Sequence, residues 1–216
     1  MNIKEFLLKR KVCRAFKKEQ LTHKVIQELL ETAQNAPSGS NMQPWEVYVV
    51  INENLEMLRE KILKASEEKG RNYSIPFEGE VPNKYLNRRK ELMDELKNYL
   101  EKDQLKLSYI LKGSLSFFDA PAVAFLYIHK SLYPARAIDI GSYMVYFMLA
   151  AENLGLGTCP IGYIRGVSDV INEFIGVPSE YLLELAIAFG YKDTEKSVNE
   201  FKSKRAKISE NTYILG

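Results

Sequence analysis

One stretch of this sequence indicates the fold better than any other: Ala36-Pro37-Ser38-Gly39-Ser40-Asn41-Met42-Gln43-Pro44-Trp45. Residues 22–36 before it carry apolar side chains at helical spacing, with Thr22 as the expected N-cap, and Pro37 cannot continue a helix. Residues 46–51 after it are rich in β-branched side chains and predict a largely buried strand. Between the two, hydroxyl and amide groups surround Gly39, which lets a ligand approach the backbone closely. The stretch is therefore either an ordinary polar turn or one wall of a binding site.

Working outward, the chain mixes predicted helices and strands without an internal repeat. Apolar periodicity predicts helices at 2–9, 55–68, 83 to about 112, 136–153 and 168–175, the last capped by Ser168. Nearly continuous apolar runs predict strands at 122–128 and 183–190. Residues 71–82 and 155–162 carry glycine and proline without a clear period, so we expect loops there. Helix 136–153 is apolar on more than one face, which is typical of a buried helix, including one between subunits.

Composition limits the class of protein. The 216 residues are 46% hydrophobic and 27% charged with a formal charge of +2, which predicts one globular domain spanning 1–216 and gives no basic field for nucleic acid. Two cysteines without CxxC spacing and no signal peptide favour reduced thiols in a cytoplasmic protein. Two isolated histidines argue against a metal site, and the apolar windows are too short to span a bilayer of ~30 Å. We therefore expect a soluble protein without a metal or a membrane partner.

The usual catalytic motifs are missing from the sequence. Gly155-Leu-Gly157-Thr-Cys-Pro160 lacks the third glycine of a dinucleotide-binding loop, and no GxxxxGK[ST] or GxSxG occurs. Cys13 lies between Lys11 and Arg14, which could lower its pKa and make it a nucleophile. Since no histidine base accompanies it, a packed thiol is the preferred interpretation.

Two basic clusters suggest an anion site. Arg10 and Arg14 are four residues apart, and Lys202, Lys204 and Arg205 form a second group near the C-terminus. Converging cations suit a phosphate, whereas either cluster alone would be an ordinary solvated surface.

Four segments, in order, resemble the FMN-dependent nitroreductase superfamily over nearly the whole chain. They are Arg10-Lys-Val-Cys-Arg14-Ala-Phe16, Pro37-Ser-Gly-Ser-Asn41-Met-Gln43-Pro-Trp45, Gly155-Leu-Gly-Thr158 with Pro160-Ile-Gly162, and Leu185-Ala-Ile-Ala-Phe-Gly190-Tyr. The resemblance implies an α+β fold, an α/β/α sandwich with a mainly antiparallel central sheet, assembled as an intertwined homodimer with FMN at the subunit interface.

The resemblance also implies a reaction. Such an enzyme takes electrons from NADH or NADPH and passes two at a time to nitroaromatic or related electron-poor acceptors in a ping-pong cycle. The alternatives are a flavin enzyme of the same fold that reduces quinones, enones, free flavin or halogenated aromatics, a flavin-binding protein without turnover, and a basic binding module without a cofactor.

The residues that the resemblance assigns to the flavin come from distant parts of the chain. No side chain is needed as a catalytic acid or base; Arg14 would tune the flavin near N1 and O2, and the Gly162 N–H would donate to N5. Arg10 and Arg205, with Lys204 as a rival, would hold the phosphate, and Val12 stands where the family often has serine. The cofactor-binding set is Arg10, Lys11, Val12, Arg14, Pro37, Ser38, Gly39, Asn41, Gln43, Pro160, Ile161, Gly162, Lys204 and Arg205, with Pro37 to Gly39 serving the FMN of the partner subunit.

Two further segments carry expectations of their own. Residues from about 70 to 112 are either a substrate lid or an ordinary pair of packed surface helices; as a lid, they would place Tyr73, Phe77, Tyr85 and Arg88 on the acceptor side. We also expect the tail at about 200–216, which ends in Tyr213-Ile-Leu215, to embrace the partner.

Overall fold

The computed structural model describes residues 2–69 and 80–216, and these build a four-stranded antiparallel sheet. The strands are β1 (Trp45–Ile51), β2 (Ala122–His129), β3 (Leu156–Ile161) and β4 (Tyr181–Tyr191), in the order β1-β2-β4-β3. Outside these strands, Val12 forms an isolated parallel bridge with Thr158. The predicted α+β class with a mainly antiparallel sheet is confirmed.

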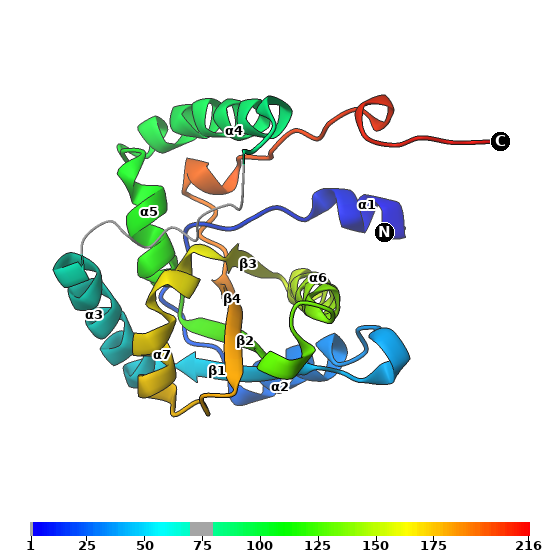
Figure 1. The fold of residues 1–216 in the computed structure, drawn as a ribbon. Coiled ribbons are helices and arrows are strands. Elements are labelled where there is room, and N and C mark those ends of the chain that lie inside the picture. Colours follow the sequence, from blue (N-terminus) through cyan, green and yellow to red (C-terminus); the bar gives the residue numbers. More distant parts are fainter. Residues whose placement is uncertain (1, 70–79) are drawn as a thin grey trace.

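Helices cover both faces of the sheet. Alternate residues of β2 point to opposite sides, and since both sets are apolar, each face has to be buried. Ala124 and Leu126 face α2 (His23–Ala33) and α6 (Ala137–Asn153), whereas Val123 and Phe125 face the other layer. That layer contains α3 (Asn52–Lys69), α5 (Ser108–Leu115) and α7 (Ser168–Ile175) (Figure 1). The result is the predicted α/β/α sandwich, with one apolar core on each side of the sheet.

Most predicted elements end within a few residues of the observed ones. Thr22 caps α2 by accepting a hydrogen bond from the Val25 N–H at 3.3 Å, as predicted. Ser168 is the first residue of α7, so the cap lies one position earlier, at Val167. Short 3-10 turns cover Gly39–Asn41, Phe117–Asp119, Lys130–Leu132, Tyr163–Val167, Ser197–Asn199 and Ile208–Glu210.

The predicted loop at 155–162 is wrong, since Leu156–Ile161 forms strand β3. Gly155, at φ +75°, makes the left-handed turn out of α6 that favours glycine. Gly157 is required by close packing, because a Cβ there would lie 2.6 Å from Cys13 Sγ. Pro160 is tolerated because β3 is the last strand of the sheet, where proline can occur. These residues indicated a loop, but in the fold they are adaptations of an edge strand.

The helical pattern from 83 to about 112 is divided into α4 (Asn83–Lys102) and α5. Asp103 ends α4, and its carboxylate accepts hydrogen bonds from the Ser197 and Val198 N–H groups at 2.9 and 2.8 Å. Gln104, at φ 58°, then turns the chain into α5. The break therefore depends on a contact with residues far along the sequence.

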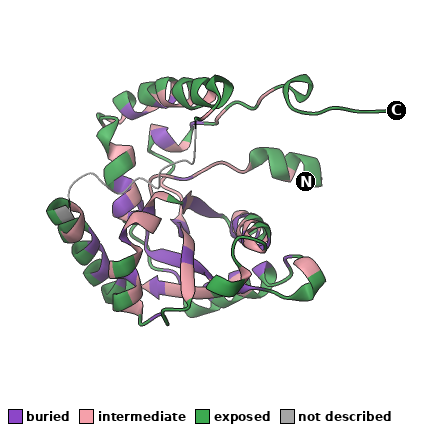
Figure 2. Ribbon diagram, viewed as in Figure 1, coloured by how far each residue is buried: buried purple, intermediate pink, exposed green. Residues whose placement is uncertain are grey.

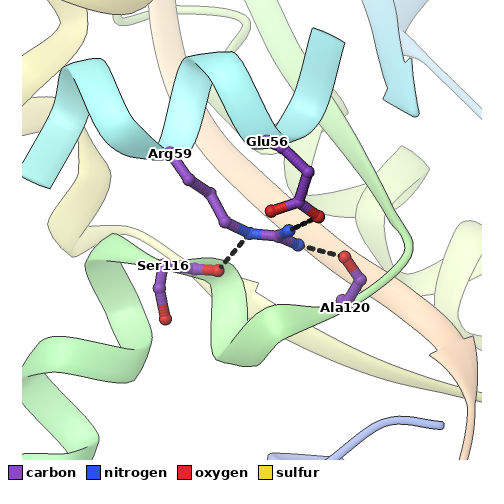
Figure 3. Close-up of polar contacts among 4 residues, drawn as sticks. All are labelled: Glu56, Arg59, Ser116 and Ala120. Atoms are coloured by element: carbon purple, nitrogen blue, oxygen red, sulfur yellow. Dashed lines mark hydrogen bonds and ion pairs between the residues drawn. The ribbon is translucent and has the colours of Figure 1, made fainter. Parts of the chain in front are cut away.

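Arg59 joins α3 to the turn that precedes β2 (Figure 3). Its buried guanidinium donates to the carbonyl oxygens of Ser116, at 2.8 Å, and Ala120, and it pairs with Glu56 at 2.5 Å. The turn needs such support because Phe117, Phe118 and Asp119 all have φ above +50°.

Two segments project from the body on the same side (Figure 1). They are α1 (Ile3–Lys9) and the C-terminal tail, and both are largely exposed (Figure 2). The tail ends in Tyr213, Ile214 and Leu215, which are 82%, 91% and 94% exposed. In the described ranges, no helix has the length and apolar character needed to cross a membrane.

Candidate functional site

A cavity of about 210 Å³ lies between the N-terminal segment and the start of the C-terminal tail. It is lined by Leu7, Leu8, Arg10, Lys11, Val12, Arg14, Leu92, Phe201, Lys202, Ser203 and Arg205. Five of these residues are cationic and none is acidic. The basic clusters that are far apart in the sequence therefore meet in space, and the charge of this cavity favours an anion. We call it the cationic pocket.

The N-terminal wall of the cationic pocket is fixed through its backbone. The Cys13 N–H donates to the Thr158 carbonyl at 2.9 Å, which fastens the segment to β3. The Asn199 side chain accepts from the Arg14 N–H at 2.7 Å and donates to the Ala15 carbonyl at 2.7 Å. Tyr109 adds a hydrogen bond from its hydroxyl to the Arg14 carbonyl at 2.5 Å. Arg14 is thus held from two sides while its side chain lines the pocket.

The C-terminal wall is held by packing and by two lysines. Phe201 is buried against α4, and its ring lies 5.4 Å from that of Tyr99. Lys202 Nζ donates to the Leu8 carbonyl at 2.7 Å, and Lys11 Nζ donates to the Glu200 carbonyl at 3.3 Å. These bonds tie the two walls together across the pocket.

Arg10 provides the test of whether a phosphate fits. Its Nη1 atom is buried and has no hydrogen-bond partner within the described residues. A buried guanidinium nitrogen without an acceptor is unfavourable, and a phosphate oxygen would satisfy it. The residues present therefore fit the phosphate of FMN.

Of the two rivals for the second phosphate contact, the structure brings only Arg205 into the pocket. The Lys204 ammonium points elsewhere and forms an ion pair with Glu95 of α4, which raises the pKa of the lysine. Arg205 Nη1 donates to the Ser203 hydroxyl at 2.6 Å, which steadies the guanidinium beside the cavity. Within one chain, Arg205 therefore lies beside Arg10, whereas Lys204 lines an adjoining groove.

The second motif lies outside the cationic pocket, at the start of α6. The Gly39 N–H donates to Asp139 Oδ1 at 3.2 Å, and the Gln43 N–H donates to the Ser38 hydroxyl at 2.9 Å. The Gln43 side chain donates to the Asn41 carbonyl at 3.1 Å, so both residues brace the loop. Within one chain, Pro37, Ser38, Gly39, Asn41 and Gln43 do not meet the cationic residues.

The third motif follows the N-terminal wall along β3. Pro160 and Ile161 pair with Ile187 and Ala186 of β4, and Gly162 comes directly after the strand. A Cβ added at Gly162 would meet nothing within 4 Å, so one side of this residue is open. Because Val12 bridges Thr158, the first and third motifs are neighbours, although Pro160 to Gly162 do not line the cationic pocket.

The predicted acceptor side is only partly described. Tyr73 and Phe77 lie outside the described residues. Arg88 lines a groove of about 720 Å³ between α4 and the tail and pairs with Glu210 at 3.0 Å. Tyr85 is 49% exposed beside Lys84 and lines neither cavity. The groove and the cationic pocket share Leu92, Ser203 and Arg205 as lining residues, so they lie next to each other.

Cys13 is not an activated thiol. Burial raises its pKa to about 11 in spite of Lys192 and Arg14 nearby, and burial raises the pKa of Cys159 to about 12. Cys13 is 3% exposed and its Sγ contacts the Ala15 carbonyl at 3.1 Å. The packed-thiol interpretation fits this environment, and the nucleophile alternative does not.

Three contributors were missed from the sequence. Asn199 and Tyr109 hold the backbone of the N-terminal wall, and Ser203 supports Arg205. A single asparagine, tyrosine or serine has no local signal for such a role. Asn199 and Tyr109 contact Arg14 over more than 90 residues of sequence, and Ser203 lies in the irregular tail.

Comparisons with known proteins identify the family of the chain. The sequence profile of the Nitroreductase family matches residues 7–191. Nitroreductase NfnB of Mycolicibacterium smegmatis is 33% identical over 210 residues, covering 94% of this chain and 88% of the relative. The iodotyrosine deiodinase of Thermotoga neapolitana is 30% identical over 188 residues, covering 87% of each chain.

Solved structures give the same fold. The crystal structure of the FMN-dependent nitroreductase NfnB from Mycobacterium smegmatis in complex with NADPH superposes with a TM-score of 0.88 at 30% identity. The superposition covers 99% of this chain and 97% of the NfnB chain. With the profile matching most of the chain, and with the sandwich fold and the cationic pocket in place, this protein belongs to the Nitroreductase family.

Proposed function

We propose that this chain is an FMN-dependent NAD(P)H oxidoreductase that reduces nitroaromatic or related electron-poor acceptors two electrons at a time by a ping-pong mechanism. The observation that carries the proposal is the cationic pocket: among the residues that the structure describes, its lining is free of acidic side chains and the buried Nη1 atom of Arg10 finds no hydrogen-bond partner. The family membership and the NADPH complex of the NfnB relative support the same activity.

The side chains of the pocket divide the binding work. Arg10 and Arg205 bind the phosphate, with Lys202 adding charge at the same wall. Arg14 stabilises negative charge on the pyrimidine edge of the ring, and Lys11 and Val12 line the ribityl chain. The Gly162 N–H would donate to N5 of the flavin, and the absence of a side chain at this residue would permit the approach. When bound, FMN supplies the electron transfer between the nicotinamide and the acceptor.

The active unit is a homodimer in this proposal. α6 exposes a continuous apolar face of Ile138, Gly141, Ser142, Val145 and Tyr146, of which Ile138 is 78% exposed. α1 and the tail project from the body as arms (Figure 1). A partner packed on α6 would cover this face and bring its own Pro37 to Gly39 to the flavin, with the tail embracing the other subunit.

The lid and the domain assignment complete the proposal. We propose one FMN-binding domain over 1–216, with α4 and the segment before it forming the acceptor side. α4 suits this position because the groove beside it adjoins the cationic pocket, and Leu92 of α4 lines both. We also place the enzyme in the cytoplasm, where Cys13 and Cys159 would stay reduced.

A second candidate function is the reductive removal of halogen from aromatic compounds. The relative that favours it is the iodotyrosine deiodinase of Thermotoga neapolitana, whose identity of 30% is close to that of NfnB. The same cationic pocket serves both reactions, so the acceptor decides between them.

The test is anaerobic mixing of the purified flavoprotein with NADH or NADPH, followed by a screen of nitroaromatic and halogenated aromatic acceptors. Oxidised flavins absorb light at about 450 nm. We therefore expect a yellow protein whose absorbance at this wavelength bleaches with at least one nicotinamide. We expect reoxidation by nitrobenzene derivatives. Failure of both nicotinamides to bleach the flavin would contradict the reductase assignment, and reoxidation by halogenated compounds alone would favour the second candidate.

A further inference from the structure

Asp139 is a buried carboxylate in the first turn of α6, only 6% exposed. Its Oδ1 atom accepts the hydrogen bond from the Gly39 N–H at 3.2 Å, and its Oδ2 atom is buried without a hydrogen-bond partner in the described part of the chain. The helix N-terminus offsets some of the unfavourable burial, but an unsatisfied carboxylate oxygen is still costly. Within the described residues, the hydrogen bond that the Asp139 side chain does form is the one from the Gly39 N–H.

The loop that Asp139 holds is strained and braced from within. Ser40, Asn41 and Gln43 have φ of 54°, 55° and 47°, the left-handed region that favours glycine. The bonds from Gln43 to Ser38 and Asn41 fix the shape of the loop but not its place on the molecule. Within the described residues, the hydrogen bond that links Ser38 through Gln43 to another element is the one from Gly39 to Asp139.

Arg136, the residue at the N-cap of α6, also packs on Gly39. A Cβ added to Gly39 would lie 1.9 Å from Arg136 Nη1 and 3.0 Å from Arg136 Cζ. The Arg136 side chain therefore covers the Cα of Gly39 while Asp139 holds its N–H. Together they fix this peptide to the start of α6.

We infer that Asp139 is a positioning residue, which sets the location of Pro37, Ser38 and Gly39 relative to the apolar face of α6. This inference rests on the proposed function, in which that loop contacts the FMN of the partner subunit and α6 forms the dimer interface. Since Asp139 and Ile138 are adjacent on one helix, a single rigid element carries both the interface and the anchor of the loop. The loop therefore reaches the partner's flavin in a fixed place as soon as the dimer forms.

The test compares Asp139→Ala and Asp139→Asn with wild type, as full-length dimers. Asparagine retains an oxygen that can accept from Gly39, whereas alanine does not. Tyr143→Phe is the matched control, because Tyr143 lies one turn further along α6 and its buried hydroxyl has no hydrogen-bond partner in the described ranges. The readouts are the FMN dissociation constant of the apoprotein, the visible circular dichroism of bound flavin and the oligomeric state.

We expect Asp139→Ala to weaken FMN binding ~10-fold or more and to change the flavin dichroism while the protein stays dimeric, because a hydrogen bond to a charged group is lost. Asp139→Asn should restore most of the affinity, and Tyr143→Phe should match wild type. Equal affinity and dichroism in Asp139→Ala would overturn the positioning role. Wild-type protein that binds no FMN would contradict the proposed function itself, which is a separate result.

Amide hydrogen exchange in the wild-type holoprotein decides the question if Asp139→Ala does not fold. The Gly39 N–H should exchange much more slowly than the Ser40 N–H of the same loop, because Gly39 donates to Asp139. Equal, fast exchange at the two positions would contradict the anchor.

Discussion

At the scale of single residues, the phosphate site depends on the Nη1 atom of Arg10, which has no hydrogen-bond partner within residues 2–69 and 80–216. A phosphate oxygen would satisfy the buried Nη1 atom of Arg10, and Arg205 stands on the opposite wall of the same cavity. These two arginines come from opposite ends of the chain, so neither can form a phosphate site by itself.

Arg205→Ala should weaken FMN binding by ~1.5 to 3 kcal/mol, the contribution of a charge-assisted hydrogen bond. Lys204→Ala is the matched control, because Lys204 is next in sequence and equally cationic but pairs with Glu95 outside the cavity. Flavin titration of the two apoproteins measures the difference. Equal losses in both variants would mean that overall charge, and not placement in the pocket, controls binding.

Cys13→Ser should leave turnover nearly unchanged, since the thiol is buried and protonated. Burial raises its folded pKa from 9.0 to about 11, so the folded protein binds more protons than the unfolded chain between these values. The stabilising contribution is complete below about pH 9 and is lost as pH rises to about 11. Chemical denaturation should be measured from about pH 8, roughly one unit below the unfolded pKa, to about pH 11. Over this range the free energy of unfolding should fall less steeply with pH for Cys13→Ser than for wild type. Loss of turnover with flavin retained would instead revive the nucleophilic thiol.

At the scale of elements, buried polar contacts place the helices around the sheet. Arg59 fastens α3 to the turn before β2, where three successive residues have positive φ. Asp103 does the same between α4 and the segment that begins the tail.

Arg59→Ala should lower the free energy of unfolding by ~2 to 3 kcal/mol, because the buried Ala120 carbonyl and the part-buried Ser116 carbonyl lose their donor and the packing of the side chain is lost. Glu56→Ala, which removes the exposed partner, should cost less than ~1 kcal/mol. Urea denaturation of both variants checks the order. A larger effect for Glu56→Ala would show that the ion pair, and not the support of the turn, is what stabilises this corner.

Val145→Glu should disrupt the proposed dimer, because it places a carboxylate in the exposed apolar face of α6. Val145 is 43% exposed, and Leu111 on α5 is 45% exposed, so Leu111→Glu is a matched control away from that face. Light scattering after size exclusion should show monomers only for Val145→Glu, with loss of flavin because Pro37 to Gly39 of the partner no longer reach it. Two dimeric variants with bound FMN would place the interface elsewhere.

At the scale of the whole molecule, the sequence alone predicts those elements whose signal lies within the element itself. Thr22 and the helical stripe after it predicted α2, and the β-branched run predicted β1 to within one residue. Helix α6 was recognised because its apolar residues exceed one face, and the structure leaves Ile138 and Val145 exposed as an uncovered patch.

The rest depended on contacts between distant segments. Gly157 and Pro160 suggested a loop, and only their place at the edge of the sheet, with Cys13 packed on Gly157, explains why they form β3. Asn199 gave no local signal because its partners lie near residue 14. The choice between Lys204 and Arg205 likewise required knowing that Glu95 of α4 lies beside the lysine.

The most direct measurement of the central claim compares the affinities of the wild-type apoprotein for FMN and for riboflavin, which lacks the phosphate. If Arg10 and Arg205 bind the phosphate in the cationic pocket, the affinity for FMN should be at least ~100-fold higher than that for riboflavin, since two charge-assisted hydrogen bonds are gained. Equal affinities for the two flavins would contradict the assignment of this pocket.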